Sequence, residues 1–314
     1  MTSESASRSS VATGATAGRL SLRGESGLRD AWLTARSYVM LAKPGIIWLL
    51  LVTTVPVMVM AEGGWPGLDL IALVLLGGVL TSGGANALNQ WFDRDIDAVM
   101  HRTRGRPIPQ GWISPGRALV FGLAVAVVGG VQLALTVNLL SAGLAMGAVA
   151  FYVFVYTMWL KRWTPQNIVI GGAAGSVPPL VGWAAVQNDL AVTPLLLFLI
   201  IFLWTPPHFW ALALRYKDDY ARANVPMLPV VSGEPATKRQ ILLYALVLTA
   251  VSALLVPFGD ASWIYLGVAL ALGASFVAAA VLLWRGRVAP MTVFFVSIAY
   301  LPLLFIVAGV DSVL

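Results

Sequence analysis

Residues 192–214 read VTPLLLFLIIFLWTPPHFWALAL, a run without Asp, Glu, Lys or Arg. About 20 consecutive apolar residues cross the hydrocarbon core of a bilayer as an α-helix, so this run is long enough. Runs of similar character occupy residues 45–61, 68–88, 116–137, 139–160, 167–187, 241–257, 261–284 and 290–310. Their glycines and prolines are compatible with membrane helices. The sequence therefore predicts an all-α integral membrane protein with about nine transmembrane helices.

The overall composition agrees with a protein that lives in a bilayer. Hydrophobic residues make up 59% of the 314 residues and charged residues only 11%, whereas soluble domains carry about a quarter charged residues. There is too little polar surface to cover a water-facing globule. The chain has no cysteine, which excludes disulfides, thiolate catalysis and cysteine-ligated metals.

The charges alternate from one gap between spans to the next. All 20 Lys and Arg residues fall in the N-terminal tail and in every second gap. The charged residues on the opposite side are all acidic: Glu62, Asp69, Asp189, Asp260 and Asp311. The positive-inside rule then predicts a cytoplasmic N-terminus and a C-terminus outside. The preference for Arg over Lys and for Ala, Val and Gly is typical of a GC-rich bacterial genome, so we expect a bacterial inner membrane with the charged face towards the cytoplasm.

The chain divides into a tail and one membrane domain. Residues 1–30 are rich in Ser, Ala, Thr and Gly, so we expect a disordered cytoplasmic tail over residues 1–37 and a transmembrane domain over residues 38–314. Two long cytoplasmic loops, residues 91–115 and 215–240, each hold an acidic cluster followed by bases, prolines and a glycine. Such parallel repeats predict a site at the interface of two halves.

The first acidic cluster has the spacing of a helix face. Asn89, Asp93 and Asp97 stand at positions i, i+4 and i+8, which one helix face brings together. Carboxylate and amide oxygens are ligands that Mg²⁺ prefers. The alternative is a solvated helix end, but like charges four residues apart destabilise a helix and ionisable groups at membrane depth are usually functional. Asp95 faces elsewhere, and we expect it to pair with Arg94 or Arg102.

The second acidic cluster follows the sixth predicted span. Asp218 and Asp219 lie between Tyr216 and Tyr220 at the cytoplasmic end of that span. Taken alone they could be an ordinary helix end. Opposite the first cluster in a repeat, they are candidates to hold a second Mg²⁺.

Basic residues complete a site for a diphosphate. Arg102, Arg106, Lys161 and Lys43 all fall on the predicted cytoplasmic face. Topology alone would also place cations there. Guanidinium groups, however, bind phosphate through two hydrogen bonds, and acids for a metal together with bases for phosphate indicate a diphosphate-handling site.

His208 lies within an apolar span, about two turns before Asp218. The preceding Pro206-Pro207 pair is expected to loosen the helix, and irregular backbone at membrane depth tends to line a cavity. We therefore expect His208 to face a substrate. The alternative is a packing histidine that bonds to a neighbouring helix.

These segments resemble a known family. The Asn89, Asp93 and Asp97 element, continued by residues 100–107, resembles the first motif of the UbiA-type intramembrane prenyltransferase superfamily. Residues 156–167 with Pro178-Pro179, residues 204–212 and residues 219–231 resemble one branch of it, the haem O synthases, or protohaem IX farnesyltransferases. The resemblance covers residues 38–310.

The resemblance implies nine helices around a central cavity, with Mg²⁺ and farnesyl diphosphate at the cytoplasmic rim. It implies transfer of the farnesyl group to the vinyl group of haem B, which gives haem O and diphosphate. The catalytic residues would be Asn89, Asp93, Asp97, Asp219 and Lys161, and the substrate-binding residues Arg102, Arg106, Lys43, His208, Asp218, Tyr156 and Tyr216. The adjacent Asp218 and Asp219 depart from the family's spaced pair, which leaves open whether both bind metal.

Two other functions remain compatible with the sequence. A quinone precursor or another lipophilic molecule could replace haem B as acceptor. A transporter would also have about nine helices, but it would spread ionisable residues through the spans, whereas here they gather at one rim. The expected partners are the two substrates and the lipid bilayer, with a haem A-forming enzyme or an oxidase assembly implied only by the family and no nucleic acid.

Overall fold

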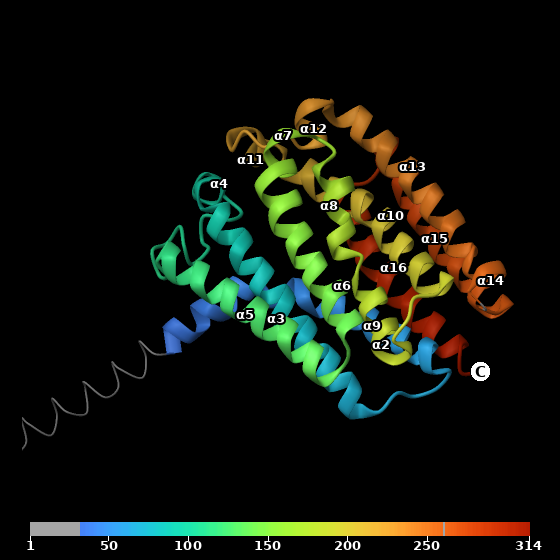
Figure 1. Ribbon diagram of the computed structural model, residues 1–314. Coiled ribbons are helices and arrows are strands. Elements are labelled where there is room, and N and C mark those ends of the chain that lie inside the picture. Colours follow the sequence, from blue (N-terminus) through green and yellow to red (C-terminus); the bar gives the residue numbers. More distant parts are fainter. Residues whose placement is uncertain (1–31, 260) are drawn as a thin grey trace, which may run out of the picture.

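The computed structural model describes residues 32–259 and 261–314, apart from the side chains of residues 46, 48, 50 and 51. All regular structure in these residues is helical (Figure 1). Most of the predicted tail and Asp260 lie outside the described residues. Residues 32–42 form a helix, so the predicted end of the tail at residue 37 falls inside a helix.

Eight helical segments of the described chain are long and apolar enough to cross a membrane. They consist of α3 (Leu68–Phe92), α5 (Pro115–Thr136), α6 (Leu139–Ala150) with η1 (Phe151–Leu160) and α7 (Lys161–Trp163), α8 (Asn167–Gly175) with α9 (Pro178–Gln187), α10 (Val192–Arg215), α13 (Gly233–Ala253) with α14 (Leu255–Phe258), α15 (Trp263–Trp284) and α16 (Pro290–Asp311). The first predicted span corresponds to α2 (Pro44–Glu62), of which Val52–Glu62 is counted as a shorter apolar helix.

Two predicted spans differ in detail from the helices. The span predicted at 167–187 is broken between α8 and α9, because proline at 178 and 179 supplies no backbone donor and restricts the residue before it. The span predicted at 241–257 begins earlier, at Gly233, so the end of the second long loop is helical.

The expected loosening of the helix at Pro206-Pro207 is wrong. Both prolines lie inside α10, which runs without interruption from Val192 to Arg215. Most of its residues from Ile200 to Leu214 are buried, and α10 packs on α8, α13 and α16. Membrane helices tolerate such prolines where neighbouring helices re-satisfy the freed backbone groups, and α10 has neighbours on several sides.

The buried apolar residues form several clusters along the bundle. The largest apolar cluster joins α10, α13, α15 and α16, and a second one joins α2, α3, α6 and α9. Helices α3 and α5 approach closely at Gly84, where the absence of a side chain makes room. A Cβ at this position would lie 2.6 Å from the backbone nitrogen of Ala126. This close approach fixes the end of α3 that carries Asn89.

Four short helices gather at one end of the bundle. Figure 1 places α4 (Arg94–Val99), α7, α11 (Lys217–Arg222) and α12 (Leu228–Val231) together at the end opposite the C-terminus. The two long loops therefore share one face. This face carries the candidate site.

Candidate active site

The first acidic cluster lies on two helices. The sequence predicted a single helix, but α3 ends at Phe92 and α4 begins at Arg94, with Asp93 between them at φ −82° and ψ 8°. The i to i+4 backbone bonds nevertheless persist, from Asp93 to Asn89 at 2.9 Å and from Asp97 to Asp93 at 2.8 Å. The backbone hydrogen bonds therefore connect Asn89, Asp93 and Asp97 across the junction of α3 and α4.

Asn89 and Asp93 form the centre of a buried network. Asn89 Nδ2 donates to Asp93 Oδ2 at 2.7 Å and to Thr157 Oγ1 at 3.1 Å, and Lys161 Nζ bonds to the same Asp93 Oδ2. Lys43 Nζ donates to Asn89 Oδ1 at 2.8 Å. Asp93 is 0% exposed. The sequence predicted four of these residues as site residues, and the structure brings them into direct contact.

The local backbone places both lysines. Lys161 directly follows η1, a π-helix, a form that is rare and often found at functional sites. Lys43 sits in the left-handed region at φ 53°, between the helix of residues 32–42 and α2. The side-chain amides of Asn86 and Gln90 donate to the carbonyl oxygens of Ala42 and Leu41 and so fix this junction. The sequence did not identify three of these residues as part of the site, because they carry no charge: Asn86, Gln90 and Thr157.

Asp97 has its own basic partner. Arg106 Nη1 donates to Asp97 Oδ1 at 2.8 Å and to Oδ2 at 2.6 Å, and Asp97 is 1% exposed. Thr103 Oγ1 donates to the Asp97 carbonyl oxygen at 3.2 Å. The loop after α4 therefore folds back to place a predicted phosphate-binding arginine on a predicted metal ligand.

The two carboxylates of the second acidic cluster differ in their exposure to solvent. Asp219 is 5% exposed, and its carboxylate accepts from the backbone nitrogen of Arg102 at 3.1 Å and pairs with Arg222. Burial opposes ionisation of Asp219, but the amides of Arg102 and His101 and the charge of Arg222 outweigh it and hold the pKa of this carboxyl below its usual value. Asp218 is exposed.

The predicted aromatic residues lie beside these groups. Tyr156 stacks on Tyr152 with ring centroids 5.3 Å apart, and both come from η1. The Arg102 guanidinium lies 5.7 Å from the Tyr216 ring centroid, and its Nη2 is 3.4 Å from the Tyr220 hydroxyl. The loop after α4 thus contacts α11 through Arg102.

The expected pairing of Asp95 with Arg94 or Arg102 is wrong. Arg162 donates from Nη1 and Nη2 to the two oxygens of Asp95 at 2.8 Å each, and this contact lowers the pKa of the Asp95 carboxyl. Asp95 lies in the first turn of α4, and its partner Arg162 comes from α7. A contact between residues 67 positions apart in the chain has no local sequence signal.

His208 is enclosed by α10 and α16. Its Nδ1 is 2.7 Å from Ser297 Oγ, and its ring stacks against Trp204 and Phe294. His208 is 8% exposed. The alternative for this histidine was a packing residue bonded to a carbonyl of a neighbouring helix; the bond does go to a neighbouring helix, α16, but to the hydroxyl of Ser297.

The residues present have the chemistry of a divalent-metal site but are not gathered as one. Within residues 32–259 and 261–314, no three His, Asp or Glu side chains lie close enough together to hold a metal ion. Asp93 Oδ1, however, is buried without a hydrogen bond, and its nearest cation is Arg162 Nη2 at 3.9 Å. A buried carboxylate oxygen without a partner is costly and fits a hard cation.

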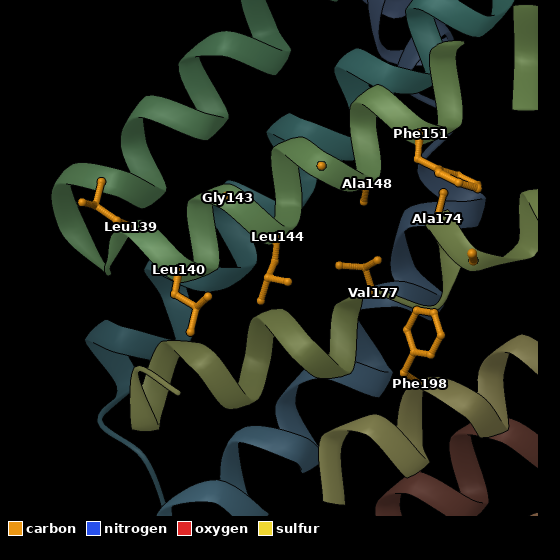
Figure 2. A pocket seen from close by; sticks show the side chains of 11 residues that line it. Leu139, Leu140, Gly143, Leu144, Ala148, Phe151, Ala174, Val177 and Phe198 are labelled. Carbon is orange, nitrogen blue, oxygen red and sulfur yellow. The ribbon is translucent and has the colours of Figure 1, made fainter. Parts of the chain in front are cut away.

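An apolar groove of about 450 Å³ lies between α6 and α8, with Val177, which precedes α9, and Phe198 of α10 beside it (Figure 2). Figure 2 shows Leu144, Val177 and Phe198 directed into this space. Its lining includes no charged residue, so it is separate in character from the acidic and basic end of the bundle.

Comparison with known proteins decides the family. The model of the UbiA prenyltransferase family matches residues 50–308. The chain belongs to this family. Solved structures share the fold: the structure described as digeranylgeranylglyceryl phosphate synthase superposes with a TM-score of 0.71 at 18% identity, covering 89% of this chain and 99% of the other.

A second family member of known structure is a UbiA homolog from Archaeoglobus fulgidus bound to DMAPP and Mg²⁺. It has a TM-score of 0.64 at 17% identity and covers 88% of this chain and 99% of its own. The likeness in both cases is one of fold.

Much closer relatives exist among bacterial proteins. A protoheme IX farnesyltransferase of Clavibacter michiganensis is 51% identical over 89% of this chain and 93% of its own. Proteins of the same name from Streptomyces avermitilis and Synechocystis are 48% and 51% identical, over 92% and 88% of this chain and 97% and 89% of their own lengths. This UbiA-family chain therefore groups with prenyltransferases of one named activity.

Proposed function

We propose that this protein transfers the farnesyl group of farnesyl diphosphate to the vinyl group of haem B, which gives haem O and releases diphosphate. The observation that carries the proposal is the identity of about half of all residues with proteins named protoheme IX farnesyltransferase, over nearly the whole chain. The resemblance drawn from the motifs points to the same reaction.

The diphosphate is bound at the end of the bundle that carries α4 and α11. Asp93, Asp97 and Asp219 each pair with a base in the structure: Lys161, Arg106 and Arg222. When a diphosphate enters, Lys161 and Arg106 turn to its oxygens, because phosphate is a strong acceptor for both cations and a bidentate one for the guanidinium of Arg106. Their carboxylates are then free for a cation. The paired state thus keeps buried charges neutralised until the substrate arrives.

Asn89, Asp93, Asp97 and Asp219 would hold Mg²⁺, with Asp218 as a further candidate on the exposed side of α11. The ion, when bound, neutralises charge that develops on the leaving diphosphate. Lys43, Lys161, Arg102 and Arg106 stabilise the same charge from the protein side. The solved Archaeoglobus homolog, bound to DMAPP and Mg²⁺, supports this choice of metal.

The acceptor chemistry needs no protein nucleophile. The vinyl group attacks the farnesyl carbon as its bond to diphosphate breaks, water adds to the cation left on the acceptor to give the hydroxyl of haem O, and the proton that the water loses passes to the released diphosphate. Tyr156 and Tyr216 lie beside Lys161 and Arg102 and form part of the substrate wall. His208, deeper along α10, faces the acceptor. A central cavity between the two halves accommodates both substrates.

The membrane arrangement completes the proposal. We place α2 as the ninth span, the N-terminus in the cytoplasm, and the protein in the bacterial inner membrane with its charged face inward. The tail ends before the helix of residues 32–42, and the catalytic domain begins with that helix. The alternation of charge along the sequence supports this orientation.

Two alternatives make different predictions. A quinone-precursor prenyltransferase would use the same diphosphate end, and a transporter would need no prenyl donor. The names of the close relatives favour haem over both. Haem extracted from bacterial cells that express the gene, and from matched cells that lack it, should contain haem O only in the first. Prenylated quinone precursor in place of haem O would favour the first alternative.

A further inference from the structure

The His208 ring is covered on both faces. Trp204 stacks on it with ring centroids 4.2 Å apart at 19°, and Phe294 stacks on it at 4.6 Å and 24°. Two rings nearly parallel to His208 at these distances cannot share one face without overlapping each other, so they lie on opposite faces. Phe209 packs against the edge of the ring, with centroids 5.1 Å apart at 87°, so a ligand must reach His208 along the part of the edge that Phe209 and Ser297 leave open.

The hydrogen bonds of Ser297 decide which edge nitrogen carries the proton. Ser297 Oγ donates its one hydrogen to the Phe294 carbonyl oxygen at 2.6 Å. It must then accept from His208 Nδ1 at 2.7 Å, so Nδ1 carries the hydrogen. The neutral ring consequently bears its lone pair on Nε2. Nε2 makes no hydrogen bond to any residue in the part of the chain that the structure describes.

Ser297 also fixes the ring from the main chain. Its carbonyl oxygen accepts from Trp204 Nε1 at 2.8 Å, and Trp204 is one of the two rings that enclose His208. Ser297 is 0% exposed. A single residue of α16 therefore sets the tautomer of His208 through its hydroxyl and the position of the covering ring through its carbonyl.

A packing role alone does not account for this arrangement. An apolar or aromatic residue at position 208 would fill the same space between Trp204 and Phe294 without a ring nitrogen that lacks a partner at membrane depth. Histidines that bind metals characteristically donate their other ring N–H to a fixed acceptor, which sets the tautomer and the ring orientation. His208 and Ser297 have this arrangement.

We propose that Ser297 is a positioning residue that presents the Nε2 lone pair of His208 as a ligand to the iron of a metalloporphyrin acceptor. The proposal rests on the proposed function, since haem B is the metalloporphyrin that the reaction uses. It specifies that the acceptor is recognised through its iron as well as through its porphyrin ring. Neutral imidazole is a common axial ligand of haem iron.

The test uses the full-length protein purified in detergent and titrated with ferric haem B, with the Soret band and spin state as readouts. Iron-free protoporphyrin IX serves as the parallel probe. The wild type should give the spectrum of imidazole-ligated haem. His208→Ala should lose it and regain it with added imidazole, while its affinity for protoporphyrin IX stays unchanged.

Ser297→Ala should weaken haem binding about 10–100-fold, as loss of an outer hydrogen-bond partner does at metal sites, and leave protoporphyrin binding unchanged. Ser297→Thr keeps the hydroxyl and should restore haem binding. Ser297→Cys keeps the size with a weak acceptor, and it should behave like Ser297→Ala even where the alanine variant folds poorly. Tyr300→Phe is the matched control, because it removes another buried bond of α16, to Ser252 at 2.8 Å, without touching His208.

Three results would overturn the proposal: no imidazole-type spectrum in the wild type, equal loss of haem and protoporphyrin binding in Ser297→Ala, or the same loss in Tyr300→Phe. Failure of the proposed function is a separate outcome. It would show as absence of haem O formation from farnesyl diphosphate by a wild type whose haem spectrum is as expected.

Discussion

The backbone nitrogen of Arg102 donates a 3.1 Å hydrogen bond to the carboxylate of Asp219, although the two residues stand 117 positions apart in the chain. The bond joins the loop after α4 to α11, and so links the two acidic clusters. Because the donor is a backbone group, Asp219 selects the conformation of the loop that also carries Arg106. Asp219 thus has a structural role in addition to the proposed metal role.

This bond predicts a dependence of stability on pH. The pKa of Asp219 is lower in the folded protein, so the carboxylate stabilises the fold above the unfolded pKa, near 4. The contribution is lost as pH falls through the folded value. Asp219→Asn should lower the unfolding temperature at neutral pH, and the difference from wild type should shrink below about pH 4. A difference that stays constant across this range would contradict the assignment.

Asp93 and Asp95 form a matched pair of carboxylates that tests the site. Asp93 is buried with an Oδ1 that accepts no hydrogen bond, whereas the side chain of Asp95 is 60% exposed in its pair with Arg162. Asp93→Asn should reduce haem O formation about 100-fold or more, because it removes charge from the proposed metal site. Asp95→Asn should stay close to wild type, since exposed ion pairs contribute about 0–1 kcal/mol. Similar losses in both variants would argue against a specific role for Asp93.

Arg106 should not be replaceable by lysine. Its Nη1 bridges both oxygens of Asp97, and a guanidinium can chelate a phosphate in a way that an ammonium cannot. Arg106→Lys should raise the KM for farnesyl diphosphate, with Arg104→Lys as the control in the same loop. Steady-state kinetics at saturating haem B would measure both. An unchanged KM in Arg106→Lys would exclude the diphosphate role.

Membrane topology can be measured independently of activity. Reporter fusions at Glu62 and Asp189 should lie outside, and fusions at Gly105 and Gly233 in the cytoplasm, because the Lys and Arg residues concentrate on the second side. A single reversed reporter would remove the candidate site from its proposed compartment and change the number of spans.

The sequence predicts those features of the fold and site that depend on residues close together in the chain. Spans of apolar residues and the four-residue spacing of Asn89, Asp93 and Asp97 are local, and they gave the helices and the acidic end of the bundle. Contacts such as Lys43 with Asn89, or Arg162 with Asp95, join residues 46 and 67 positions apart and depend on how helices pack. The sequence marks such charges as candidates but does not pair them.

Helix breaks were harder to predict than helices. Prolines interrupt the fifth span between α8 and α9 but leave α10 continuous. The local chemistry of the two proline pairs is the same. Burial does not separate them either, because the two spans are buried to a similar extent. The π-helix η1, which precedes Lys161, likewise carries no signal that separates it from an ordinary apolar helix.

The most direct measurement is a reconstituted reaction with isotope-labelled farnesyl diphosphate, haem B and Mg²⁺, using the purified full-length protein in lipid vesicles. Mass spectrometry of the extracted porphyrins follows the label. Wild-type protein should transfer the labelled farnesyl group into haem O, and removal of Mg²⁺ by a chelator should stop the transfer until the ion is restored. Intact haem B with no labelled porphyrin, from folded protein supplied with both substrates and Mg²⁺, would contradict the proposed function.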